Sequence, residues 1–303
     1  AVGVAISRAI VRALFTNERS ARIMNLIGMI LGLGPALAPT LGGVTMELFG
    51  WHAIFVLMLA MGLVTLVATK VSLVETVARD LSRIRPRALV ASYATLLRNG
   101  YFLSASLVLA GAIGALYTLA TVLPFILMDR VGLTATQFGA GMLCQSGMFL
   151  SGSLVVHRIM PRMGSIRIVP IGIFFIAIGS LACAVLLRVA EPGFLTVMGP
   201  VAIYAFGIAF VLPAMSTACL APFPQIAGAA AAMNGFLQMG AGLAGSMLAA
   251  LFVDPVLAMA TLIPGMGLIA ILSWALWRIL PEPALATTVL ARQSGTIPPP
   301  PAE

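Results

Sequence analysis

Side chains that could carry out catalysis or bind a metal are few in this sequence. The two histidines, His52 and His157, do not form a Ser-His-Asp arrangement, and neither paired carboxylates nor a phosphate-binding loop is evident. Cys144, Cys183 and Cys219 are spaced neither as metal ligands nor as a redox pair, so we interpret them as small apolar packing residues. The sequence therefore predicts no enzyme activity, no metal site and no cofactor.

The remaining candidates are polar side chains in the middle of long apolar runs, where a polar group is unfavourable in a membrane and marks a candidate functional site. Arg8 is charged; the uncharged candidates are Asn25, Tyr117, Thr118, Thr121, Gln145, Ser146, Tyr204, Ser216, Asn234 and Gln238. Each could line a cavity or form a hydrogen bond between helices, worth roughly 0.6 kcal/mol, and Arg8 could instead extend to the lipid headgroups. As a set they fit a mostly apolar cavity for amphipathic, drug-like molecules.

The composition shows which elements must position these side chains. Of the 303 residues, 61% are hydrophobic and 9% are charged, and the mean hydropathy is +1.10. A soluble domain has roughly 25% charged residues, and an outer-membrane β-barrel alternates apolar and polar residues instead of forming long apolar runs. We therefore expect an all-α integral membrane protein.

Charge-free runs mark the transmembrane helices, each of which needs about 20 apolar residues. The runs cover residues 23–46, 48–69, 99–128, 131–157, 168–187, 192–253 and 255–277. The 192–253 run is too long for one helix, and Pro222-Phe223-Pro224 divides it because proline lacks an amide donor. This predicts eight complete spans, and residues 1–15 read as the end of a further one, which gives a fragment with about nine transmembrane helices.

Lysine and arginine are distributed very unevenly over the connections between these runs. Alternating sides from the first connection, one side collects nearly all of them and the other has only Arg130 and Arg188. By the positive-inside rule, the basic side is cytoplasmic, and the C-terminus lies there too. The net charge of +8 is then a topology signal, so the expected partner is the lipid bilayer and not nucleic acid.

The polar residues divide the chain into four parts. Residues 1–69 hold the first spans, residues 70–98 form a basic cytoplasmic loop with an amphipathic segment, and residues 99–280 hold six spans. Six spans make a self-contained bundle, whereas the part before the loop does not. The tail, residues 281–303, ends in four consecutive prolines before Ala302 and Glu303 and has no periodicity, so we expect it to be disordered.

One of the apolar runs has glycine and proline at unusual spacing. Its members are Gly34, Pro35, Ala38, Pro39, Gly42 and Gly43. Prolines four residues apart soften one helix face, and we expect close packing at Gly42 and Gly43. The segment resembles the antiporter signature on the fifth helix of drug-efflux members of the major facilitator superfamily, although Ala38 stands where glycine is usual.

Further segments resemble the Bcr/CflA branch of that superfamily, the bicyclomycin and chloramphenicol-resistance type. They are Ser7–Phe15, Gly50–Phe55, Leu123–Ile126 with Val131–Leu133 and Gln137–Gly139, and Pro213 with Leu220–Phe223 and Ala227–Gly228. The segment with Arg158, Arg162, Gly164 and Arg167 is similar to the second copy of the superfamily's gating loop, with His157 where an acid is expected. The resemblance implies helices four to twelve of a twelve-helix transporter, with the first three absent.

The resemblance also implies a function. It predicts a secondary active transporter of the bacterial inner membrane, monomeric when full length, that exports small drug-like compounds by alternating access and is driven by the proton gradient. The proton-coupling residue is expected in the absent helices, so we expect the 303-residue chain to be incomplete for transport. A non-transporting membrane protein, or a nonfunctional remnant of a transporter, is the alternative.

Overall fold

A computed structural model describes residues 38, 41–72, 86–223 and 226–281, and within these ranges the regular structure is entirely helical. Residues 41–49 are helical, and Gly50, with φ of 78°, separates them from the next helix. The elements that follow are α3 (Trp51–Ser72), α4 (Pro86–Arg98), α5 (Gly100–Pro124), a π-helical turn η2 (Phe125–Arg130), α6 (Ala135–Met163), a short η3 (Ile166–Ile168), α7 (Val169–Val189), α8 (Phe194–Leu220), α9 (Ala227–Ala249) and α10 (Pro255–Ile279).

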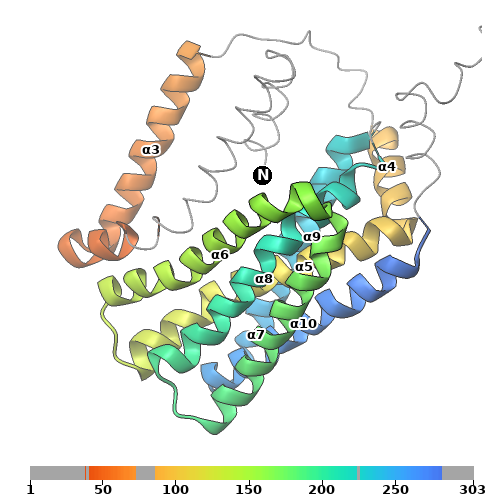
Figure 1. Cartoon of the computed structure of the whole chain (residues 1–303). Helices are drawn as coiled ribbons and strands as arrows, with labels where there is room; N and C mark the ends of the chain where they lie inside the picture. The colour runs from red at the N-terminus through yellow and green to blue at the C-terminus, as the bar shows by residue number, and fades with distance from the viewer. Residues whose placement is uncertain (1–37, 39–40, 73–85, 224–225, 282–303) are drawn as a thin grey trace, which may run out of the picture.

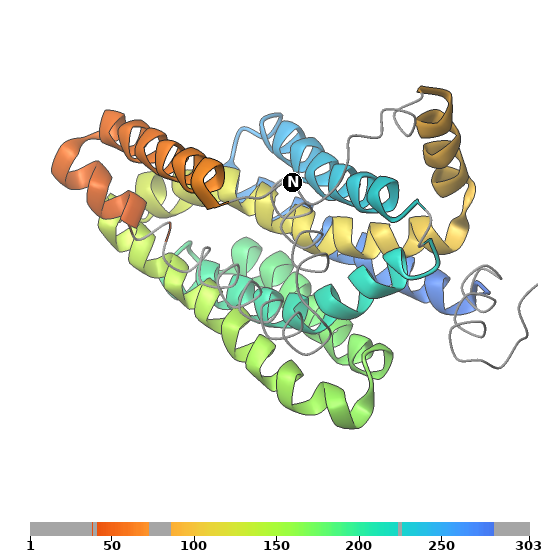
Figure 2. The same cartoon turned by 90° about the horizontal axis from the view of Figure 1, so that it is seen from above.

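Helices α5 to α10 form one bundle (Figures 1 and 2). Helix α5 is central, since it packs against α8, α9 and α10, while α7 packs against α8 and α10, and α6 packs against α8. The amphipathic segment expected before the bundle is the helix α4, which contacts α5 and α9. These contacts hold α5 to α10 together within the residues 99–280 in which six spans are expected.

Six of the described helices are long and apolar enough to cross a membrane: Trp51–Val71, Gly100–Arg130, Ala135–Met163, Ile166–Val189, Phe194–Leu220 and Pro255–Ile279. Helix α9 spans 23 residues but is rich in alanine and glycine, which are less hydropathic than leucine or valine. It corresponds to the second half of the divided 192–253 run. The expected total of nine helices includes spans in residues 1–37, which lie outside the described residues.

Local sequence signals explain where several helices begin and end. Asn99 caps α5 by accepting from the Phe102 amide at 3.0 Å, and Thr134 and Gln137 form a reciprocal capping box at the start of α6. Gly164 ends α6 with φ of 81°, a conformation that favours glycine. Helix α8 ends at Leu220 and α9 begins at Ala227, so the chain breaks at Pro222 as expected.

Close contacts between backbones hold the bundle together, and glycine makes them feasible. A methyl group on Gly172 of α7 would lie 2.7 Å from the carbonyl oxygen of Gly207 of α8. A methyl group on Gly207 would likewise lie 2.7 Å from the carbonyl oxygen of Gly172. A methyl group on Gly111 of α5 would lie 2.6 Å from the carbonyl oxygen of Met266 of α10. The helices at these points are therefore as close as their main chains allow.

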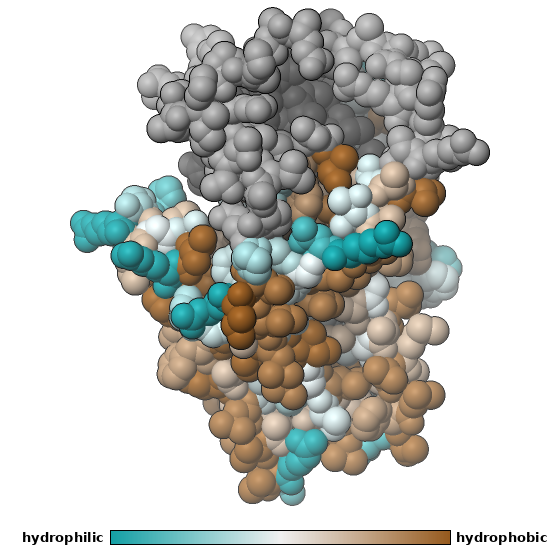
Figure 3. All heavy atoms as spheres, turned by 90° about the vertical axis from the view of Figure 1, so that its right-hand side faces the viewer, coloured by the Kyte–Doolittle hydropathy of each residue, from teal (hydrophilic) through white to brown (hydrophobic). Residues whose placement is uncertain are grey.

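The outer surface of the bundle suits a lipid environment. Many large apolar side chains are exposed, and no residue of α3 from Trp51 to Val71 is buried. Figure 3 shows a face that is mostly hydrophobic, with hydrophilic side chains gathered toward its ends. Of the cysteines expected to pack inside, Cys183 and Cys219 are buried but Cys144 is exposed, so that expectation is wrong for Cys144, whose position on α6 faces outward.

Candidate functional site

The candidate residues lie on four helices of the bundle. Tyr117, Thr118 and Thr121 are on α5, Gln145 and Ser146 on α6, Tyr204 and Ser216 on α8, and Asn234 and Gln238 on α9. Arg8, Asn25, Gly34, Pro35 and Pro39 lie outside the described residues. The structure does not bring the described candidates into one cavity, and most of them fall into three groups by their contacts and burial.

The first group holds helices together. Tyr204 is 1% exposed, and its hydroxyl donates to the Gly111 carbonyl at 3.1 Å. Thr118 is fully buried and donates to the Gly114 carbonyl at 3.0 Å, with the Met266 sulfur at 3.5 Å. These hydroxyls have protein partners, which favours the interpretation as bonds within and between helices over substrate contact.

The second group contains buried polar atoms that lack a protein partner. Asn234 is 7% exposed and its Oδ1 atom has no hydrogen bond, and the same is true of the buried Oε1 atom of half-buried Gln145. A buried amide oxygen without a partner is unfavourable by about 1–3 kcal/mol, so such an atom in an apolar helix is a candidate for ligand contact. Ser180 Oγ and Trp277 Nε1 share this property, and sequence reasoning missed both.

The third group is partly exposed. The side chain of Tyr117 packs on Gly242 of α9, where an added methyl group would lie 2.5 Å from the tyrosine Cβ. Ser216 and Gln238 are half-buried, whereas Ser146 is buried on α6. Tyr117 thus contributes to the α5–α9 contact.

A cavity of about 570 Å³ lies where the ends of α5, α9 and α10 meet. Its walls are mostly apolar, and its polar groups include Thr121 and Ser246, whose hydroxyl oxygens are 2.8 Å apart. Among the sequence-predicted cavity residues that the structure describes, only Thr121 lines it. Ser246 was missed because its pairing partner is 125 positions away along the chain.

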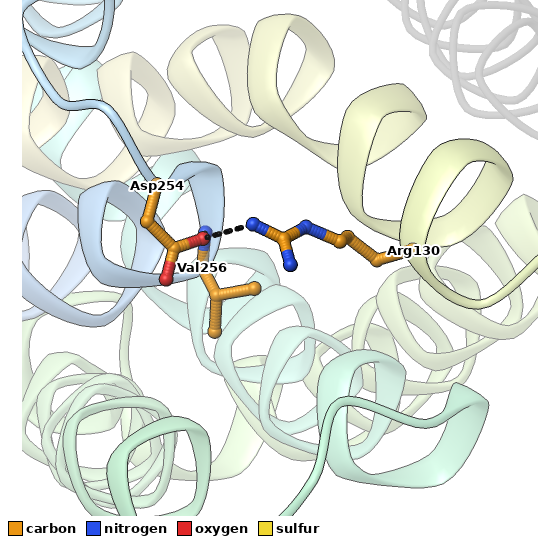
Figure 4. Close-up of polar contacts among 3 residues, drawn as sticks. All are labelled: Arg130, Asp254 and Val256. Carbon is orange, nitrogen blue, oxygen red and sulfur yellow. Dashed lines mark hydrogen bonds and ion pairs between the residues drawn. The ribbon is translucent and has the colours of Figure 1, made fainter.

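An ion pair lies at this cavity. The guanidinium of Arg130 approaches the carboxylate of Asp254 at 3.6 Å, and the same carboxylate caps α10 by accepting from the Val256 amide at 3.1 Å (Figure 4). Both side chains are partly exposed, so the pair is of the weak surface kind. It joins the end of η2 to the start of α10 beside the cavity.

The basic residues of the gating-loop segment lie together at one end of the bundle. Arg158, Arg162 and Arg167 are exposed around the turn at Gly164. Beneath them, Val156 packs with Ile168, Ala209 and Phe210 in a small apolar cluster. This arrangement exposes the positive charges while the turn itself is fixed by packing.

The described part of the antiporter-like segment touches the start of α6. A methyl group on Gly43 would lie 2.6 Å from the Ala135 carbonyl oxygen, whereas no described atom lies within 4 Å of the same position on Gly42. Close packing is therefore observed at Gly43, whereas at Gly42 it stays a prediction, because the described residues place no atom against it. Ala38 is exposed.

Within the described ranges, no group of three or more His, Cys, Asp or Glu side chains could hold a metal ion. The carboxylates there lie at helix ends or in connections: Glu47, Asp129, Glu191 and Asp254. No Asp or Glu of the described residues lies in the apolar middle of a spanning helix. The polar groups of the described bundle are thus mostly isolated from one another along apolar helices.

The sequence matches known proteins over most of its length. The model of the Major Facilitator Superfamily matches residues 1–249. The multidrug transporter MdfA of Escherichia coli O6:H1 is 23% identical over 235 residues, which cover 78% of this chain and 57% of that protein. The multidrug resistance protein MdtL of Citrobacter koseri is 28% identical over 240 residues, or 77% of this chain and 58% of that protein.

The chain therefore spans a little over half the length of the curated relatives it matches. The names of these relatives describe multidrug transport or resistance and not a catalysed reaction. This agrees with the sequence-based expectation that the chain has no enzyme activity.

Proposed function

This chain belongs to the Major Facilitator Superfamily, and we propose that it serves the export of small amphipathic drug-like compounds across the bacterial inner membrane. In this proposal it is a drug:proton antiporter of the Bcr/CflA type that works by alternating access, with a cytoplasmic C-terminus. The names of the relatives MdfA and MdtL support the multidrug character. The resemblance of the glycine-proline segment to the antiporter signature supports the exchange mechanism.

The observation that carries the proposal is the unpaired, buried amide oxygen of Asn234 in the mostly apolar helix α9. A transporter of mostly apolar molecules needs a few polar groups to orient its substrate, and a ligand donor would remove the penalty of the unpaired oxygen. Gln145 offers a second such oxygen on α6. Substrates with an amide, hydroxyl or ammonium donor on an apolar body would satisfy these acceptors.

The energy source in the proposal is the proton gradient. Since the described carboxylates lie at helix ends or in connections, proton coupling is proposed without an assigned side chain. Transport should therefore stop when an uncoupler collapses the gradient, and this dependence separates antiport from passive leakage.

The test is dye export by an efflux-deficient bacterium that expresses the complete gene product carrying this sequence. We expect uncoupler-sensitive efflux of a lipophilic dye, lowered about tenfold by Asn234→Leu, since the loss of a hydrogen bond to a buried partner is worth about 1–3 kcal/mol. Thr217→Val is the control, because Thr217 is exposed on α8 and bonds its own helix. Efflux no greater than with the empty vector, despite membrane insertion, would overturn the proposal.

A further inference from the structure

We propose that the carboxylate of Glu47 is a latch that holds the helical residues 41–49 on the N-terminus of α6 and keeps one side of the transporter closed. The inference rests on the proposed function, because a latch has this role only in a protein that alternates between two openings. It concerns a contact between the segment before α3 and the bundle formed by α5 to α10.

The contact is made of two hydrogen bonds to one residue. Glu47 Oε1 accepts from the Thr136 amide at 2.8 Å, and Glu47 Oε2 accepts from the Thr136 hydroxyl at 2.5 Å. The two residues are 89 positions apart, so the bonds join separate parts of the fold. Figure 1 shows the helical residues 41–49 beside the start of α6.

The start of α6 is suited to accept a carboxylate. The first amides of a helix lack partners within the helix, and the helix dipole makes this end positive. The capping box of Thr134 and Gln137 satisfies the amides of these two residues, and Glu47 satisfies the amide of Thr136 between them. The bonds from Thr136 hold the pKa of the Glu47 carboxyl below its usual range, as expected for a bonded anion.

A second contact supports the same closure. Gly43 lies one helical turn before Glu47, so both residues are on the same helix face. As described above, the backbone at Gly43 approaches that of Ala135 so closely that a methyl group would collide with its carbonyl oxygen. The segment thus presents a small residue for close approach and a carboxylate for capping to the first turn of α6.

The contact is also suited to release. Glu47 is exposed, and most side chains of residues 41–49 are exposed or half-buried, so that separation exposes little apolar surface. The largest influences on the pKa of Glu47 are the two hydrogen bonds from Thr136, which is neutral, and α6 has no acidic residue in its first turn. Along the chain, the titratable group nearest to Glu47 is His52. The groups nearest to the start of α6 are Asp129 and Arg130, and Arg130 is paired with Asp254.

The test measures the separation of the two segments directly and needs no substrate. Spin labels would be placed at Leu48 and Ala140, both exposed, in the complete gene product with its native cysteines replaced, reconstituted in lipid nanodiscs. Glu47→Gln and Thr136→Val each weaken the latch, and the double variant tests whether they act through one contact. Glu191→Gln, an exposed carboxylate in the α7–α8 connection, is the matched control.

We expect each latch variant to raise the ratio of separated to closed molecules about tenfold, because charge-assisted hydrogen bonds are lost. The double variant should add little to either single one, and the control should match the wild type. Gly43→Ala should also raise the ratio, whereas Gly42→Ala should not. Distance distributions unchanged by Glu47→Gln and Thr136→Val would overturn the latch even if dye efflux is normal. Absent efflux with the expected distance changes would instead count against the proposed function.

Discussion

The hydroxyl of Tyr204 donates to the main-chain carbonyl of Gly111 at 3.1 Å and so links the middle of α8 to the middle of α5. The phenol ring is almost completely buried at this point. Gly111 also lies against the backbone of α10, so three helices meet around this bond. A polar side chain in an apolar run is here a structural link.

Replacing Tyr204 by Phe should remove this bond and leave the ring in place. We expect a loss of stability of about 1 kcal/mol, within the range measured for hydrogen bonds between membrane helices, with an unchanged range of exported compounds. Thermal unfolding of the purified protein, together with tolerance to a panel of drugs, would check both parts. A changed drug range at unchanged stability would place Tyr204 in the substrate pathway instead.

The α7–α8 contact should be intolerant of a methyl group. Gly172→Ala forces the Gly172 and Gly207 backbones apart, and overpacking of this kind is unfavourable by about 1–3 kcal/mol. Gly199→Ala in α8 is the control, because no described atom lies within 4 Å of the added carbon. Thermal unfolding of the two variants in the same detergent should show a clear drop for Gly172→Ala alone; equal unfolding temperatures would show that the helices can separate without penalty.

Arg188 should be important for attaching the end of α7 to α10. Its guanidinium donates to the Ala260 carbonyl at 2.8 Å and to the Thr261 hydroxyl at 3.1 Å. Because a lysine cannot reproduce this forked geometry, we expect Arg188→Lys to lower stability by about 1 kcal/mol. Arg167→Lys, at an exposed site on the opposite end of α7, should be neutral. Comparable losses in both variants would contradict a specific role for the fork.

The Glu47 latch should open in acid. Its carboxyl has a pKa below the ordinary value of 4.5 when bonded to Thr136, so the bonded state binds fewer protons than the released one. The latch is therefore fully stabilised at neutral pH and loses this stabilisation as pH falls through the lowered pKa. Spin-label distances should show the wild type approaching Glu47→Gln in acid, while Glu47→Gln itself changes little; a wild type insensitive to acid would contradict this.

The orientation in the membrane can be tested with cysteines in the connections before and after α7. We expect Glu191→Cys to react with a membrane-impermeant thiol reagent in intact cells, and Ser165→Cys to react only after the cells are opened. The native cysteines are replaced first, since Cys144 is exposed. The opposite labelling pattern would reverse the proposed topology, including the cytoplasmic C-terminus.

The helices of the bundle were predictable because they depend on local composition. The expected run of residues 168–187 became α7 (Val169–Val189), and the expected run of residues 255–277 became α10 (Pro255–Ile279). A charge-free stretch of this length must satisfy its backbone hydrogen bonds internally in lipid, which only a helix achieves within one segment. The division at Pro222 follows equally from local chemistry.

The roles of the polar side chains depended on the tertiary structure. Nothing in the local sequence separates Tyr204, which has a partner on α5, from Asn234, whose amide oxygen has none. Nor does it separate Gly43, which touches Ala135, from its neighbour Gly42. The length of an apolar run is a property of adjacent residues. These contacts instead depend on which helix faces meet across 89 or more positions of the chain, and the packing of the whole bundle determines which faces meet.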